Sequence, residues 1–418
     1  MPQLRHGLVL GKKSVRKKVF VWGIGAYAAD VINCIDQEKA VIRGMIDSMG
    51  SESGGLWMNE WPVCRPEEVK PLVYDLIIVS VKNYGDIIKT ASNVGLRRDK
   101  LLFFWNEEDR GAEVFEQNRV TLLLQRLLLE EYQLRLANTP YEYHIKQTFS
   151  VLPAEELLIR LKHEKASLCR FGDGEFEMIR GKERPWFQKP DRCLSDRLFE
   201  ILHSEEKNVL LAIPDIFGSL EVYTEYAADK IRQYLDLETR EEVGRLIPAN
   251  RTFYDAYVTR PYLIYRDKEH ANVIFKLFQD IWKGRNVLLI EGEYSRTGVG
   301  NRLLEGTKSV RRIIAPAQDA FACYDRILEC ALAHKVKDML ALISLGPTAT
   351  VLAYDLTCHG IQAVDIGQLD NEYEWSLCKA ETRVPIAGKG VAELSWHHAP
   401  DAIPDETYER QIVAKILK

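Results

Sequence analysis

The sequence predicts an α/β protein with two Rossmann-like parallel-sheet domains joined by a long helix. Short apolar segments alternate with helical patterns in residues 18–105, and the same alternation returns in residues 153–366. Between them, residues 112–138 are rich in leucine at helical spacing. A chain of 418 residues is also too long for one ordinary domain. We expect an accessory domain over residues 1–110, a connecting helix over 111–144, a second domain over 145–395 and a tail over 396–418.

The first domain opens with a pattern typical of nucleotide binding. Residues 18–35 read as a buried strand, a glycine turn and a helix, in which Gly23, Gly25 and Ala28 match G-x-G-x-x-A. Small residues at these positions let the backbone approach a pyrophosphate at the helix N-terminus. The next strand ends at Asp47, about where a dinucleotide-binding unit has its acidic ribose ligand. The pattern therefore predicts a candidate NAD(P) site.

The remaining elements of this domain are short. Strands are predicted over residues 41–46, 74–80 and 101–105, with a helix over 84–94. The unit lacks a second mononucleotide-binding half. A Rossmann-like scaffold without a ligand therefore explains the pattern equally well.

The connecting segment is predicted to be an amphipathic helix that ends at Asn138-Thr-Pro140. Its apolar side is formed by five leucines, Leu123, Leu124, Leu127, Leu128 and Leu134. Packing on one or both domains accounts for this side. The alternative is a self-association surface that makes the protein a homo-oligomer.

The second domain is predicted to be a doubly wound sheet. A helix over 153–162 begins with a proline near its first turn. The strands that follow are short and apolar and cover residues 167–171, 209–213, 287–290, 339–345 and 362–366. Each is followed by a polar or glycine-containing loop. Because parallel sheets carry their sites at the carboxyl ends of strands, we expect the chemistry in these loops.

The loop after 167–171 carries two acids around a glycine, Asp173 and Glu175. Two carboxylates two residues apart on a loosened turn can point at one hard cation. Mg²⁺ or Mn²⁺ held in this way keeps positions open for water and substrate phosphates. An ordinary surface turn has the same composition.

Other loops carry groups suited to phosphate. Residues 291–301 set Arg296 and Asn301 among three glycines, and Arg260 lies beside a proline in 257–262. Thr348 lies in a glycine-threonine loop that opens a helix, where free N–H groups favour anions. The loop over 367–375 crowds acids and aromatics, Asp370, Glu372, Tyr373, Glu374 and Trp375.

Composition excludes several function classes. The net charge of −5 gives no general attraction to nucleic acid. The eight cysteines show no metal-binding spacing, which suits a reducing cytoplasm. No transmembrane segment or secretory signal is recognisable, so we expect a cytoplasmic protein.

Taken together, the motifs resemble those of the bacterial GT-D fold glycosyltransferases. The resemblance covers roughly residues 145–390 and rests on RFGDGE, TRPY, EGEYSRTGVGN, PAQDAFACY, SLGPTATVLAYDL and DIGQLDNEYEW. It implies an Asp-x-Glu motif, a divalent metal (Mn²⁺ or Mg²⁺) and a nucleotide-sugar donor, typically a UDP-sugar such as UDP-glucose. The acceptor would be a glycan or glycoprotein.

Carried over to this chain, the resemblance makes Asp173 and Glu175 the metal and diphosphate motif. The donor-side residues would be Arg170, Arg260, Arg296, Asn301, Thr348 and Tyr373. Glu293 or Asp370 would be the catalytic base. Gln368 stands where the family often has a histidine near the metal. Its carbonyl oxygen can ligate Mg²⁺ or Mn²⁺ but cannot titrate like imidazole.

Two other functions stay open on the sequence alone. The first is an NAD(P)-dependent sugar-modifying oxidoreductase or epimerase that uses Gly23, Gly25 and Asp47. The second is a degenerate transferase that acts as a binding module through the helix over 112–138, which Gln368 favours.

Overall fold

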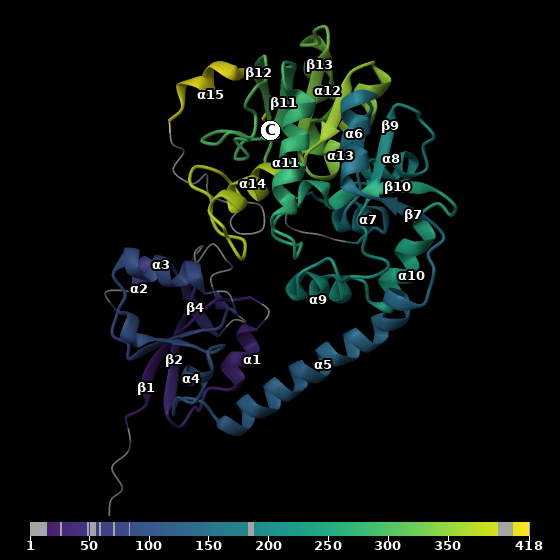
Figure 1. The fold of residues 1–418 in the computed structure, drawn as a ribbon. Helices are drawn as coiled ribbons and strands as arrows, with labels where there is room; N and C mark the ends of the chain where they lie inside the picture. The colour runs from purple at the N-terminus through teal and green to yellow at the C-terminus, as the bar shows by residue number, and fades with distance from the viewer. Residues whose placement is uncertain are drawn as a thin grey trace, which may run out of the picture. The chain divides into compact units, whose positions relative to one another are not determined.

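The computed structural model of the chain describes residues 15–25, 27–47, 50, 56–57, 60–69, 72–82, 84–182, 188–391 and 404–417. The chain forms two compact units, Met1–Tyr132 and Gln133–Lys418. The α/β class with two parallel sheets is confirmed (Figure 1). No helix in the described residues is long and apolar enough to cross a membrane.

The first unit contains five parallel strands in the order β4-β2-β1-β5-β6. These strands are β1 (Lys17–Trp22), β2 (Ala40–Ile46), β4 (Trp61–Cys64), β5 (Leu76–Val79) and β6 (Leu101–Phe103). A short β3 (Leu56–Trp57) pairs antiparallel with β4 at the edge. The helices are α1 (Ala28–Asn33), α2 (Pro66–Val69), α3 (Gly85–Val94) and α4 (Glu107–Arg110). The strands predicted over 41–46, 74–80 and 101–105 are confirmed, whereas β3 and β4 were not predicted.

The connecting helix α5 (Gln117–Tyr143) is one continuous element. The prediction that Asn138-Thr-Pro140 ends it is wrong, because the helix continues for three residues beyond Pro140. Side chains around the proline bond to the helix backbone: Asn138 Nδ2 donates to Leu134 O and Thr139 Oγ1 to Arg135 O, both at 2.9 Å. These two bonds add to the helix, but neither reaches Leu136 O, the carbonyl whose usual N–H donor Pro140 lacks.

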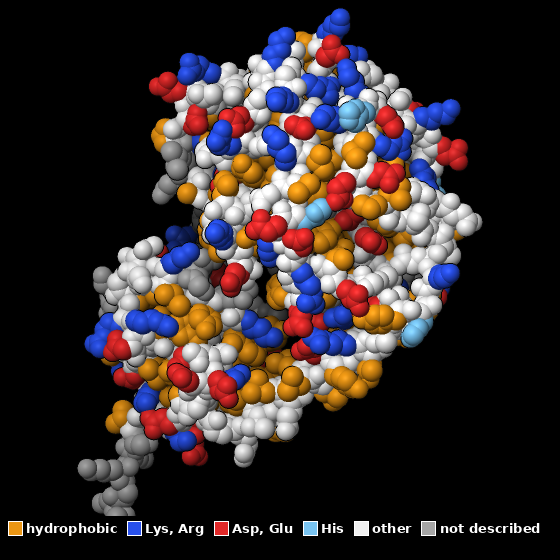
Figure 2. All heavy atoms as spheres, viewed as in Figure 1, with side chains coloured by type: hydrophobic (Ala, Val, Ile, Leu, Met, Phe, Trp, Pro, Cys, Tyr) orange, Lys and Arg blue, Asp and Glu red, His pale blue; other side chains and the backbone are white. Residues whose placement is uncertain are grey.

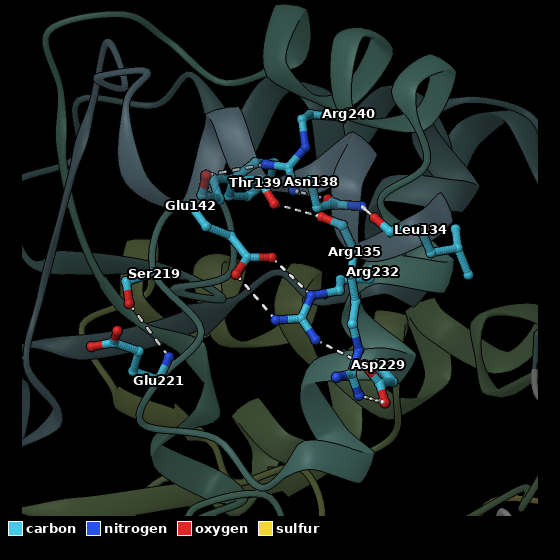
Figure 3. A network of polar contacts seen from close by, with 11 residues as sticks. Leu134, Arg135, Asn138, Thr139, Glu142, Ser219, Glu221, Asp229, Arg232 and Arg240 are labelled. Atoms are coloured by element: carbon cyan, nitrogen blue, oxygen red, sulfur yellow. Dashed lines mark hydrogen bonds and ion pairs between the residues drawn. The ribbon is translucent and has the colours of Figure 1, made fainter. Parts of the chain in front are cut away.

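The two halves of α5 belong to different units. In the first unit, Leu123 is buried, and Leu124 and Leu127 pack against the core beside it. In the second unit, α5 meets α9 (Glu225–Tyr234) and α10 (Leu237–Leu246) through polar contacts (Figure 3). Arg232 donates to both oxygens of Glu142 at 2.8 and 3.1 Å.

Arg240 completes this contact from α10. It donates to Asn138 Oδ1 at 2.7 Å and to Phe217 O at 3.1 Å. These buried charge-assisted bonds hold the C-terminal half of α5 on the second unit.

The second unit contains nine parallel strands in the order β15-β12-β11-β13-β14-β8-β9-β10-β7. Five of them confirm the prediction, namely β8 (Ser167–Arg170), β9 (Val209–Ile213), β11 (Asn286–Gly292), β13 (Met339–Ser344) and β14 (Gln362–Asp365). Four were not predicted, β7 (Ser150–Leu152), β10 (Thr252–Asp255), β12 (Ser309–Ala315) and β15 (Ile412–Lys415). β7 and β10 are too short to show a periodicity, and β12 contains two arginines.

Helices cover both faces of this sheet. On one face lie α6 (Ala154–His163), α11 (His270–Trp282) and α14 (Leu369–Leu377). On the other lie α7 (Asp173–Ile179), α8 (Arg192–Leu202), α9, α10, α12 (Tyr324–Ala333) and α13 (Pro347–Cys358). Figure 1 shows α6 and α11 side by side. Successive strand residues alternate between the two cores, so that Leu168 belongs to one and Cys169 to the other.

Residues 404–417 of the predicted tail are part of the fold of the second unit. Helix α15 (Glu406–Gln411) leads into β15, which extends the sheet beside β12. Tyr408 is buried between two guanidinium groups, 4.8 Å from Arg296 and 4.9 Å from Arg312. Residues 396–403 lie outside the described part of the chain.

Charge is mixed on the molecular surface. On the face that Figure 2 draws, acidic and basic side chains are interspersed. This agrees with the small net charge of the sequence, −5.

Candidate active site

The candidate site lies at the carboxyl ends of the central strands. From β8 the chain continues to β9 on one side, whereas from β14 it leads to β15 at the opposite edge. In open parallel sheets, ligands bind where neighbouring strands lead away in opposite directions. The carboxyl ends of β14 and β8 meet this condition.

The Asp-x-Glu pair starts α7. Asp173 is exposed at the first helical position, and its Oδ1 accepts the N–H of Gly174 at 2.9 Å. Glu175 turns back, and its Oε2 accepts the N–H of Gly172 at 2.7 Å, as the third residue of a helix often does. Burial raises the pKa of Glu175, and the nearby Arg170 opposes that rise. The two acids therefore differ, since Asp173 faces solvent and Glu175 is held by backbone.

Arg170 joins the ends of three segments. Its Nη2 and Nε donate to Asp365 Oδ1 at 3.0 Å and to Asp365 O at 3.2 Å. Its Nη1 donates to Ala256 O at 3.3 Å. A Cβ on Gly367, which has φ +47°, would overlap the Arg170 guanidinium. Arg170 thus holds β8, β14 and the segment after β10 together.

The segment after β10 is a 3-10 helix, η3 (Ala256–Thr259). Asp255, the last residue of β10, caps it by accepting the N–H of Tyr257 at 2.8 Å. Burial and the Asp173 carboxylate raise the pKa of Tyr257, whereas Arg260 and Arg383 lower it. Asp173 and Arg260 are 87 positions apart in the sequence. In the folded chain both act on the pKa of Tyr257, and their charges shift it in opposite directions.

Glu372 positions the segment that carries Arg260. It is buried in the first turn of α14, and its Oε2 accepts the N–H groups of Tyr262 and Leu263, both at 2.9 Å. Burial raises the pKa of Glu372, and these bonds and Arg260 oppose the rise. Asp255, Tyr257 and Arg383 were not predicted as site residues. A recognised strand over 252–255 would have placed Asp255 and Tyr257 in a post-strand loop.

The loop after β11 forms a second, closed cluster. Asp370 Oδ1 accepts from Gly298 N at 2.9 Å and from Asn301 Nδ2 at 2.8 Å, and its Oδ2 accepts from Lys389 Nζ at 2.6 Å. Glu374 accepts from the same Asn301 and Lys389 at 2.7 and 2.8 Å. Because both oxygens of Asp370 are occupied, these contacts favour a structural role for Asp370 and Asn301.

Arg296 and Glu293 differ in their surroundings. Arg296 is buried against Tyr408, in a left-handed backbone conformation with φ +45°. Next to it, Glu291 accepts from Arg312 at 2.5 Å and from Thr297 N at 2.7 Å. Glu293 is half-buried, and its carboxylate makes no hydrogen bond or ion pair within the described residues.

Two further predicted donor residues, Thr348 and Tyr373, are packed to different degrees, since Thr348 is buried and Tyr373 is half-buried. Thr348 is fully buried at the start of α13, with its Oγ1 3.4 Å from Gln188 Oε1. Tyr373 packs edge-on against Phe275, with ring centroids 5.0 Å apart. Both side chains thus contact other protein groups.

A divalent metal can be tested against the groups present. No group of three or more His, Cys, Asp or Glu side chains suited to a metal occurs in the described residues. Two buried oxygen atoms in the described residues have no hydrogen-bond partner, Gln368 Oε1 and Thr259 Oγ1. If Gly367 carried a Cβ, that atom would lie 3.1 Å from the Thr259 hydroxyl. Thr259 is therefore close to Gly367, the residue before Gln368. These groups fit an ion that takes most of its ligands from phosphate and water, as Mg²⁺ does.

In the first unit, one glycine of the G-x-G-x-x-A pattern, Gly23, is explained by packing without a ligand. Gly23 has φ +106°, and a Cβ there would lie 2.7 Å from Val81 and 2.8 Å from Ser80 Oγ. Its place is therefore explained by the close approach of the ends of β1 and β5. Gly25 is exposed, with nothing within 4 Å of a Cβ, and Asp47 directly follows β2. NAD(P) binding by this unit stays a prediction.

Comparisons with known proteins agree with this geometry. Residues 168–394 match the family described as glycosyltransferase GT-D fold, and residues 15–102 match the family described as C2185-like, N-terminal. The chain is 34% identical over 340 residues to a probable glycosyl transferase, Gly, of Streptococcus gordonii, which covers 80% of this chain and 47% of that protein. It is 35% identical over 268 residues to glycosyltransferase GlyD of Streptococcus pneumoniae serotype 4, which covers 63% of this chain and 32% of that protein. The chain thus spans about half or less of each relative.

Solved structures give the same result. One, of the domain of unknown function 1792, is described as having a distinct glycosyltransferase fold; it shares 32% identity, has a TM-score of 0.62, and covers 69% of this chain and 100% of its own. Another, described as a new glycosyltransferase from Streptococcus sanguinis with the same domain, shares 34% identity, has a TM-score of 0.61, and covers 64% of this chain and 99% of its own. The resemblance expected from the motifs is confirmed, and the chain belongs to the GT-D fold glycosyltransferase family.

Proposed function

We propose that this protein is a metal-dependent glycosyltransferase that moves a sugar from a nucleotide-sugar donor to a hydroxyl of a glycan or glycoprotein. A UDP-sugar such as UDP-glucose is the proposed donor. One observation carries the proposal beyond family membership. The charges of Asp173, Arg260 and Arg383 all shift the pKa of Tyr257. Tyr257 follows β10, at the edge of the sheet where ligands bind in such folds. An acid for a metal beside two cations for phosphate suits a nucleoside diphosphate.

Different side chains are proposed to stabilise the charge of the donor diphosphate, to hold the metal ion and to position these groups. Arg260 and Arg383 are cations that would stabilise negative charge on the leaving diphosphate. Asp173, Glu175 and Gln368 are the groups that would hold Mn²⁺ or Mg²⁺. When bound, such an ion supplies Lewis-acid neutralisation of the diphosphate oxygens. Arg170 supports this arrangement through Asp365 rather than through the donor.

We assign the base to Glu293. Its carboxylate is unoccupied by protein groups within the described residues, whereas both oxygens of Asp370 accept hydrogen bonds. Glu293 takes the proton of the acceptor hydroxyl, whose oxygen forms a bond to the anomeric carbon. The bond from that carbon to the diphosphate oxygen breaks, and its electron pair leaves on the nucleotide.

A screen of the intact chain tests this function. Melting temperatures are measured with UDP-, GDP- and TDP-sugars, with and without Mn²⁺, because a ligand of the folded state raises them by mass action. We expect a UDP-sugar with Mn²⁺ to give the largest rise. Sugar transfer or donor hydrolysis is then followed for the best donor.

Asp173→Asn is the decisive variant. It keeps the shape of the side chain and removes its charge, so we expect metal-dependent turnover to be lost while the melting temperature is kept. Asp196→Asn, at an exposed position of α8, is the matched control and keeps turnover. Normal turnover of Asp173→Asn would remove Asp173 from the mechanism. A folded wild-type chain without any turnover would favour the degenerate binding module.

The first unit is proposed as an accessory domain. Calorimetry of the intact chain with NAD(P) tests the alternative of an oxidoreductase or epimerase. Tight binding that Asp47→Ala weakens would support that alternative, and no binding would dismiss it.

We also propose that α5 mediates self-association. Three of its leucines spaced seven residues apart are exposed, Leu122 by 65%, Leu129 by 56% and Leu136 by 53%. A seven-residue apolar repeat is the seam of a coiled coil. Because the buried residues of the helix, such as Leu123 and Asn138, contact this chain's own units, the seam is left for a second copy of α5.

A further inference from the structure

We propose that Tyr257 is a donor-binding residue, whose hydroxyl donates a hydrogen bond to the diphosphate of the nucleotide sugar, and that Asp255 is its positioning residue. The proposal rests on the function proposed above and adds two residues to that site.

The position of Tyr257 favours an anionic ligand. Its side chain interacts with the charges of Asp173, Arg260 and Arg383. Because burial and the Asp173 carboxylate raise its pKa, the phenol stays protonated at neutral pH and can act as a donor. Its backbone N–H is bonded to Asp255, whereas its hydroxyl makes no hydrogen bond within the described residues. A neutral donor that is subject to the positive charges of Arg260 and Arg383 is suited to a phosphate oxygen.

Asp255 fixes the backbone from which Tyr257 projects. It is 8% exposed, and its two oxygens have separate partners. Oδ1 accepts the N–H of Tyr257 at 2.8 Å, and Oδ2 accepts the hydroxyl of Tyr265 at 2.5 Å. The carboxylate thus joins η3 to the segment that contains Tyr265.

Tyrosine rings complete the support. Tyr223 meets the Tyr257 ring edge-on at 5.8 Å and lies 5.1 Å from the Tyr265 ring. Tyr223 also donates its hydroxyl to Asp215 O at 2.9 Å, at the end of β9. This packing and the cap leave the Tyr257 ring few alternative positions.

The cap depends on the charge of Asp255. The groups that face it are Asp215 after β9, Tyr265, Tyr223 and Tyr257. Burial raises the pKa of Asp255 to about 6, with a smaller contribution from the Asp215 charge. A protonated carboxyl has lost part of its acceptor capacity, so the bonds to Tyr257 and Tyr265 weaken together. Donor affinity should therefore fall as the pH drops through about 6.

Tyr257→Phe tests the binding role, because it removes only the hydroxyl. Calorimetric titration of the full chain with UDP and Mn²⁺ is expected to show roughly 10-fold weaker binding, as for the loss of one hydrogen bond to a charged group. The matched control is Tyr254→Phe, on the preceding strand β10, whose hydroxyl contacts Arg160. It should bind UDP as the wild type does.

The outcomes separate the two proposals. Equal binding by Tyr257→Phe and the wild type would overturn the role of Tyr257 and leave the proposed function standing. A wild-type chain that binds no nucleotide with Mn²⁺ would overturn both. Weaker binding by both Tyr257→Phe and Tyr254→Phe would mean a general loss of structure and would also count against Tyr257.

Asp255→Asn tests the positioning role and mimics the protonated side chain. We expect this variant to bind UDP weakly at every pH from about 5 to about 8, at the level that the wild type reaches only below its transition near pH 6. Because UDP and its metal titrate equally in both proteins, only the difference between the two profiles counts. Wild-type affinity of Asp255→Asn at neutral pH, or parallel profiles, would overturn the role of Asp255.

Discussion

Replacing Asp255 by asparagine should change how the stability of the second unit depends on pH. Burial raises the pKa of Asp255 from 3.8 to about 6. The difference is about 2 units, and at 1.36 kcal/mol per unit it corresponds to about 3 kcal/mol. Since the residue is 8% exposed, little of this value is lost to solvent screening.

The direction follows from proton binding. Between about pH 4 and about pH 6 the folded state holds a proton on Asp255 that the unfolded state has lost. The free energy of unfolding therefore falls as the pH rises through this window. The ionised Asp255 carboxylate therefore lowers the free energy of unfolding by its full amount above about pH 6 and not at all below about pH 4.

Asparagine carries no charge at any pH, so the variant lacks this dependence. The free energy of unfolding of Asp255→Asn relative to the wild type should increase by about 3 kcal/mol between about pH 4 and about pH 7. At roughly 2–4 °C per kcal/mol, the melting temperature of the variant should gain about 6–12 °C on the wild type over this range.

Scanning calorimetry of both proteins at matched pH values measures the effect. Other buried acids with raised pKa values, Glu175, Asp365 and Glu372, are present in both proteins and cancel in the difference. Asp196→Asn, an exposed position, controls for a generic effect of the substitution. A stability difference that stays constant with pH, or that changes in the opposite direction, would refute the reasoning.

Two other predictions concern Gly367 and α5. Gly367→Ala should be less stable in urea unfolding than Gly181→Ala by about 1–3 kcal/mol, because both have a positive φ but only Gly367 faces a side chain, that of Arg170. Equal stability of these two variants would show that the Arg170 contact is readily relaxed. Leu122→Ser combined with Leu129→Ser should convert a dimer to a monomer in light scattering, whereas Leu123→Ala, a buried position, should lower stability. A wild-type monomer at high concentration would contradict self-association through α5.

Much of the fold was predictable because parallel strands buried on both faces are continuous apolar runs. Residues 209–213 and 339–344 are strands of this kind, and both are recognisable without any partner. The loops that follow such strands meet at one edge, so the loops that carry Asp173, Thr348 and Asp370 could be predicted to lie at the same edge of the sheet. The edge of the sheet that carries the candidate site was thus predictable from local pattern alone.

Pairing between distant residues was not predictable. Asp370 and Glu374 read as free acids in the chain, but Lys389 and Asn301 occupy them in the structure. Strand β12 contains the buried Arg312. Its charge is compensated by an ion pair with Glu291 on the neighbouring strand β11. Such partners are set by the order of strands in the sheet.

The sequence by itself determined the class of fold, the family and the Asp-x-Glu motif, because these depend on residues close together in the chain. Contacts between distant segments decide which charged groups neutralise one another. The tertiary structure buried Arg296 against Tyr408, joined Asp370 to Lys389, and placed Tyr257 beside Asp173. The physical reason is that a buried charge must find a partner, and only the folded chain specifies which partner is within reach.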